Sequence, residues 1–159
     1  MKKILLGVLL LISSISYSQS KRVCIGDVVN SIKIGSLSGN KNLTLGIKNI
    51  AEEAILDKEY SIVDKNDSTL KINFEVVYFD VLQTSAGVSV FHKNNNETII
   101  RIKGTVTQGK KKLKDHLSTG KSSEISTSTM IIDEGGGFNQ ASARSALKKT
   151  IVDLIDNLL

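Results

Sequence analysis

The sequence predicts an α+β domain in two layers, a largely antiparallel sheet with two helices packed on one of its faces. Two segments, at 43–60 and at 141–159, repeat apolar residues at the spacing of a helical face. The runs before and between them are rich in β-branched residues and alternate between apolar and polar positions, as strands do. Because each helix has one apolar stripe, both helices are expected on the same side of the sheet.

Residues 1–18 are typical of a secretory signal peptide. Two lysines precede an apolar run over residues 4–12, and Ser16 and Ser18 stand three residues and one residue before a cleavage position ahead of Gln19. The apolar run is shorter than the about 20 residues that a membrane-spanning helix requires. We therefore expect an exported protein with no transmembrane segment after cleavage, in the periplasm, associated with the outer membrane or outside the cell.

A single domain is expected over residues 19–159, because the chain contains no proline and therefore no Pro-rich linker. Loss of the leader lowers the formal net charge from +5 to +3. The one cysteine, Cys24, has no partner for an intramolecular disulfide, so the hydrophobic core must hold the fold together. Cys24 lies in an apolar alternation, which predicts a buried strand residue.

The first half of the mature chain predicts a strand, a helix and a second strand. The run at 22–30 reads as a largely buried strand, followed by a loop rich in Gly, Ser and Asn. Asn40 or Asn42 is the expected N-cap of the helix at 43–60. A short strand is expected at 60–64. The apolar face of the helix consists of Leu43, Ile47, Ile50, Ala51, Ala54 and Ile55.

The second half of the chain predicts antiparallel strands followed by a helix. A long strand at 68–82 is separated by a turn at 92–97 from a half-buried strand at 98–107. A basic hairpin tip at 109–115 leads into one or two Ser- and Thr-rich strands at 116–132. After a Gly-rich break, the closing helix has an apolar face made of Ala143, Ala146, Leu147, Ile151, Leu154, Ile155 and Leu158.

The long strand at 68–82 contains a candidate interface. Its first part is apolar on one side and polar on the other, but Val77, Phe79 and Val81 then bring an apolar stripe onto the polar side. An uncovered stripe of this kind usually marks an interface. Two alternatives can cover this stripe. The chain's own segment 82–91 can fold back over it, or another protein, including a second copy of the chain, can bind there.

A run of lysines at the predicted hairpin tip is a candidate contact for an anionic surface. Lys110, Lys111, Lys112 and Lys114 can meet anionic lipid or polysaccharide, and their simplest alternative is a solvated tip. Nucleic acid is not an expected partner, because no aromatic residues alternate with the lysines for base stacking.

The sequence contains no recognisable catalytic, metal or cofactor motif. The segment "TGKSS" (119–123) lacks the first glycine of a phosphate-binding loop. His92 and His116 are expected in polar turns, without a second ligand at metal-binding spacing. Asp27 and Asp80 each interrupt an apolar run, which favours a strand-edge or hydrogen-bonded acid over a catalytic one.

The order of these features resembles the small bacterial envelope domains grouped around the curli-secretion protein CsgG, the LpoB activator of penicillin-binding proteins and YajG-type lipoproteins. The opening "RVCIGDVVNS", the segment "LGIKNIAEEAILDKEYSIVDKND", the long strand "STLKINFEVVYFDV" and the closing "SARSALKKTIVDLIDNLL" carry this resemblance, and the leader ending in "SYSQ" looks like those of Bacteroidota. The resemblance implies a scaffold, an activator or a secretion pore that acts through protein contacts, without catalysis. Members typically carry a lipidated cysteine, which this chain lacks.

Two functions of different classes follow from the sequence. The first is an exported, non-catalytic envelope module that binds an envelope protein, a second copy of itself or a glycan, without a cofactor. The alternative is a small secreted hydrolase that acts on a cell-wall or polysaccharide substrate through an unrecognised site.

Overall fold

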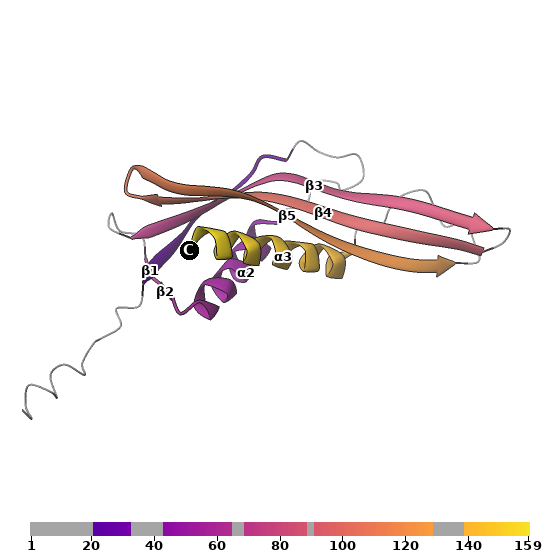
Figure 1. Cartoon of the computed structure of the whole chain (residues 1–159), viewed down its shortest axis with the longest axis horizontal. Helices are drawn as coiled ribbons and strands as arrows, with labels where there is room; N and C mark the ends of the chain where they lie inside the picture. The colour runs from indigo at the N-terminus through magenta and orange to yellow at the C-terminus, as the bar shows by residue number, and fades with distance from the viewer. Residues whose placement is uncertain (1–20, 33–42, 65–68, 89–90, 129–138) are drawn as a thin grey trace, which may run out of the picture.

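The computed structural model describes residues 21–32, 43–64, 69–88, 91–128 and 139–159. Within them the chain forms one sheet and two helices (Figure 1). In chain order the elements are β1 (Arg22–Asn30), α2 (Thr44–Asp57), β2 (Ser61–Ile62), β3 (Leu70–Val88), β4 (Phe91–Gln108), β5 (Lys111–Ser128) and α3 (Gln140–Leu158).

The five strands form one mixed sheet in the order β2-β1-β3-β4-β5. The long strands β3, β4 and β5 pair antiparallel, while β1 runs parallel to both of its neighbours. Val23, Leu70, Gln108 and Lys111 lie opposite one another and form a row across four strands. This row marks the end of the sheet at which the β4–β5 hairpin turns.

Both helices cover the same face of the sheet, as the sequence predicts, and they lie side by side (Figure 1). They run in the same direction: Lys148 pairs with Glu53 in the middle of α2, and Asp156 near the end of α3 pairs with Lys58 just after α2. The fold is therefore a two-layer α+β domain with an N-terminal-side helix and a C-terminal helix.

The core lies between this face of the sheet and the two helices. Cys24 is buried but lies outside the main core cluster, since its register partner Lys71 points to the face without helices. The helical stripes that the sequence predicts are buried. The central residues of the core are Val23, Ile47, Ala51, Ile55, Ile72, Phe74, Val76, Phe79, Ile100, Ile102, Ala146, Ile151, Leu154 and Ile155.

Helix α3 approaches the sheet so closely that two strand positions have no room for a side chain. A Cβ atom at Gly120 would meet the backbone carbonyl of Ala146 and the hydroxyl of Thr150. At Gly104 a Cβ would press on the ends of the Leu154 and Leu158 side chains. The backbone at Gly120 has no freedom to retreat, because the obstacle is helix backbone and not a flexible side chain.

The expectation that Val77, Phe79 and Val81 line one open side is wrong, because β3 contains a bulge at Val77. Val76 pairs with Ile102 and Tyr78 with Arg101, so Val77 is an extra residue that reverses the alternation of the strand. Phe79 and Val81 consequently point to the face that the helices cover, and each is only 1% exposed. Phe79 belongs to the main core.

Two local expectations also differ from the structure. The segment 92–97 is part of β4 and is not a turn, because β3 and β4 pair as far as Val88 and Phe91. The N-cap of α2 is Leu43, whose side chain makes no capping hydrogen bond; Asn40 and Asn42 lie outside the described residues.

We expect truncation of the α3 stripe to destabilise the protein strongly. Leu154 is fully buried, so Leu154→Ala should lower the free energy of unfolding by about 2–5 kcal/mol. The control is Lys148→Ala, which removes an exposed ion pair and should change it by less than about 0.5 kcal/mol. Chemical denaturation measures both changes, and equal effects would mean that α3 is not docked on the sheet.

The bulge predicts that Phe79 is a core residue and not an interface residue. Phe79→Ala should lower the stability of the isolated domain by about 3–5 kcal/mol. Leu82→Ala is the matched control on the same strand, because the Leu82 side chain is 41% exposed and its loss should cost much less. A melting temperature unchanged by Phe79→Ala would restore the interface interpretation.

Candidate functional sites

The two acids that interrupt apolar runs both have structural partners. Asp27 lies at a β-bulge in β1, where the register with β3 shifts between Ile25 and Val28. Its carboxylate accepts a hydrogen bond from Lys71 Nζ at 2.8 Å, and its backbone N–H donates to Asn73 Oδ1 at 3.1 Å. These contacts tie the bulge to β3, so Asp27 stabilises the join between the two strands.

Asp80 caps a strand edge. Its Oδ1 accepts a hydrogen bond at 2.9 Å from the backbone N–H of Val81, and its Oδ2 accepts one at 3.3 Å from the Tyr78 hydroxyl. Among the described residues, the pairing of β1 with β3 ends at Asn30 and Val76, just before this point. The carboxylate of Asp80 thus hydrogen-bonds to the backbone of β3 just beyond the last described pairing with β1.

Tyr78 is the aromatic centre of this cluster. The Arg101 guanidinium lies over its ring, 5.1 Å from the ring centre, and Arg101 is its direct partner on β4. Burial of the phenol raises the pKa of Tyr78 above its usual value of 10.0, and the negative charge of Asp80 and its hydrogen bond raise it further. The neutral phenol is therefore favoured in the folded state.

The raised pKa can be measured by alkaline titration of tyrosine absorbance. In the chain from Gln19 onward with Tyr60→Phe, Tyr78 is the one tyrosine left, and it should ionise above pH 10.0. Because the folded-state pKa is raised, the stabilisation is present below the unfolded pKa and disappears as pH rises through the folded one. Asp80→Asn should bring the pKa back toward 10.0, and no change on this substitution would exclude a contribution from Asp80.

The face of the sheet without helices holds charges of both signs that pair with one another. Lys112 and Lys103 lie 2.8 and 3.6 Å from Asp115, and Lys121 lies 3.3 Å from Glu97. The hydrogen bond from Lys112 holds the pKa of Asp115 below its usual range. A surface of mutually paired charges is well hydrated and offers no excess charge to a partner.

The four lysines of the predicted basic tip are all exposed, but they are not equivalent. Lys112 pairs with Asp115, whereas Lys110, Lys111 and Lys114 have no ion-pair partner among the described residues. The hairpin turns through Gly109, whose φ of 57° suits the first position of a two-residue type II′ loop, and Lys110. The structure therefore brings three cations without ion-pair partners among the described residues to one hairpin, Lys110 in its two-residue loop and Lys111 and Lys114 at the start of β5.

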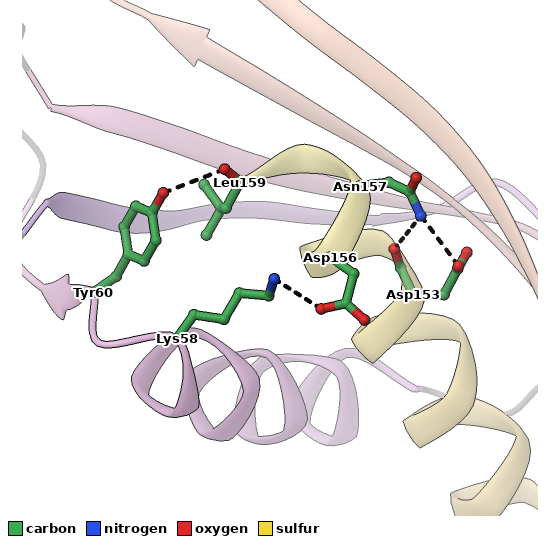
Figure 2. Close-up of polar contacts among 6 residues, drawn as sticks. All are labelled: Lys58, Tyr60, Asp153, Asp156, Asn157 and Leu159. Atoms are coloured by element: carbon green, nitrogen blue, oxygen red, sulfur yellow. Dashed lines mark hydrogen bonds and ion pairs between the residues drawn. The ribbon is translucent and has the colours of Figure 1, made fainter.

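The C-terminal end of α3 is fastened to the chain that follows α2 (Figure 2). Lys58 Nζ lies 2.8 Å from Asp156 Oδ1, and the Tyr60 hydroxyl donates to the backbone carbonyl of Leu159 at 3.3 Å. His116 does not lie in a turn; it is half-buried in β5, with Nε2 3.4 Å from Asp153 Oδ2. The side chain of His92 lies outside the described residues.

The N-terminal end of α3 is fixed by a side-chain cluster on β5. Asn139 is the N-cap and accepts hydrogen bonds from the backbone N–H groups of Ala141 and Ser142. The carboxylate of Glu124 accepts hydrogen bonds from the Asn139 amide and, at 3.4 Å, from the Ser142 hydroxyl. Each end of α3 is thus held by polar contacts while its middle packs on glycine.

The part of the chain that the structure describes contains no group of three or more His, Cys, Asp or Glu side chains that could hold a metal ion. Within the same residues, no helix combines the length and the apolar character needed to cross a membrane. The titratable groups described above instead join strands, cap an edge or fix the ends of α3.

No protein-family model matches the sequence, and no curated protein matches it. Among solved structures, a hypothetical protein from Chlamydia trachomatis is 8% identical with a TM-score of 0.48, covering 87% of this chain and 93% of that one. A lipoprotein from Neisseria meningitidis is 10% identical with a TM-score of 0.45, covering 86% and 99%. A minor lipoprotein from Acinetobacter baumannii is 11% identical with a TM-score of 0.40, covering 87% and 88%. At such low identity the likeness to these bacterial proteins concerns the architecture alone.

Proposed function

We propose that the chain is exported from the cytoplasm and serves as a non-catalytic module of the bacterial cell envelope. It acts by binding a protein or a glycan and uses no cofactor. The leader-like residues 1–18 support export, and the resemblance in element order to the domains around CsgG, LpoB and YajG supports a scaffold or activator role.

The observation that carries this proposal is that several acidic side chains have structural partners within the sheet, whereas three cations at the β4–β5 hairpin do not. Asp27 and Asp115 each pair with a lysine on a neighbouring strand, and Asp80 accepts a hydrogen bond from the backbone of its own strand, so these acids support the sheet. Three cations without an ion-pair partner among the described residues, Lys110, Lys111 and Lys114, lie close together at the β4–β5 hairpin, a position suited to contact with a partner. Loops held by a rigid scaffold commonly carry binding residues, so an exposed hairpin on this sheet is suited to contact with a partner.

Purification of the native protein from its own cell envelope tests the proposal. The intact mass should correspond to a chain that begins near Gln19, with no lipid on Cys24, and a defined envelope component should co-purify with it. A species that retains Met1, or a lipid adduct on Cys24, would contradict processing as proposed. Turnover of a cell-wall polysaccharide by the purified protein would contradict a non-catalytic role.

A further inference from the structure

The free cations of the β4–β5 hairpin share one end of the sheet with the start of β1. Lys111 and Val23 occupy opposite ends of the row that crosses four strands, so Lys110 and Arg22 lie just beyond it. Three strand spacings separate them, about 14 Å at about 4.8 Å each. Figure 1 shows the hairpin and the start of β1 at the same end of the molecule.

Two basic side chains at the start of the described chain, Arg22 in β1 and Lys21 just before it, add to the charge of the hairpin. Arg22 is exposed and has no ion-pair partner in the described part of the chain. Lys21 lies over the ring of Tyr60, 5.6 Å from its centre, which places its ammonium group at the same end. Residues 108–115 contain a single acid, Asp115, and two lysines already pair with it.

An exposed leucine stands among the hairpin lysines. Leu113 is the extra residue of a bulge in β5, because the register with β4 shifts between Val106, which faces Lys114, and Thr107, which faces Lys112. Its side chain is 44% exposed. The hairpin tip, defined as residues 110–114, thus combines unpaired cations with an apolar side chain directed away from the core.

We propose that this end of the sheet docks on an anionic phospholipid bilayer, with the lysines on the headgroups and Leu113 at the boundary with the acyl chains. This deepens the proposed envelope function and rests on it. A bilayer surface presents dense negative charge directly beside apolar matter, which matches the composition of the hairpin tip. A soluble polysaccharide would use the lysines but gain nothing from the leucine.

The acids near the C-terminal end of α3, at the same end of the molecule, are already engaged: Asp156 Oδ1 lies 2.8 Å from Lys58 Nζ, and Asp153 Oδ2 lies 3.4 Å from His116 Nε2.

Sedimentation with vesicles tests the proposal on the purified chain from Gln19 onward. The protein should bind phosphatidylcholine vesicles that contain phosphatidylglycerol and not vesicles of phosphatidylcholine alone, and binding should weaken at high ionic strength. Each lysine near such a surface contributes about fivefold to affinity, so Lys110→Gln, Lys111→Gln and Lys114→Gln together should lower it about a hundredfold. Leu113→Ser should lower it several-fold without any change in charge.

A second triple variant provides the control for net charge. Lys48→Gln, Lys121→Gln and Arg144→Gln also remove three positive charges, but from exposed positions away from the hairpin tip. This variant should bind the anionic vesicles nearly as well as the unaltered protein. Melting temperatures should stay close to that of the unaltered protein in both triple variants, because all the substituted side chains are exposed.

Three results would overturn the proposal: no binding to the anionic vesicles, equal loss in the two triple variants, or full affinity in Leu113→Ser together with stronger binding to dextran sulfate than to vesicles. The last result would assign the hairpin tip to a soluble polyanion. Since the experiment uses only purified protein and lipid, its failure leaves the processing and co-purification results of the proposed function unaffected.

Discussion

The contact of α3 with strands β4 and β5 is the constraint on which the rest of the structure depends. The helix backbone at Ala146 lies directly on Gly120, so β5 needs a residue without a side chain at that position. The approach brings the apolar stripe of α3 into the core, where it supplies seven of the twenty described core residues. Polar contacts at Asn139 and Leu159 then fix its two ends. Without this helix, one face of the long antiparallel strands would lose most of its cover.

Much of this architecture follows from periodicity, and its departures follow from backbone irregularity. The helical stripes were predictable because an apolar face repeats along the sequence. The bulge at Val77 was not, because no residue type demands it, and it reversed the direction of Phe79. The turn expected at 92–97 was wrong. A run of asparagines favours a turn locally, but here the segment pairs with both β3 and β5 and is therefore part of β4.

The candidate site was predictable in part. The lysine run at 110–114 is visible in the sequence as charge, but its pairing is not. Only the pairing of the strands shows that Lys112 is engaged by Asp115. The same pairing places Arg22 at the end of the sheet where the other hairpin lysines lie. The contact of Arg101 with Tyr78 escapes sequence reasoning for the same reason, since the bulge at Val77 sets the two residues opposite each other.

The topology also dictates when the protein can acquire its shape during synthesis. Strand β1 pairs over most of its length with β3, which is encoded well after it, and α3, which covers β4 and β5, is synthesised after both of those strands. Most native contacts therefore join segments that are distant in the chain, a pattern associated with slow folding. Until α3 is made, the side of β4 and β5 that faces the helices lacks its main cover. A nascent chain without α3 leaves the apolar face of β4 and β5 exposed. A product truncated before α3 should therefore be readily attacked by proteases.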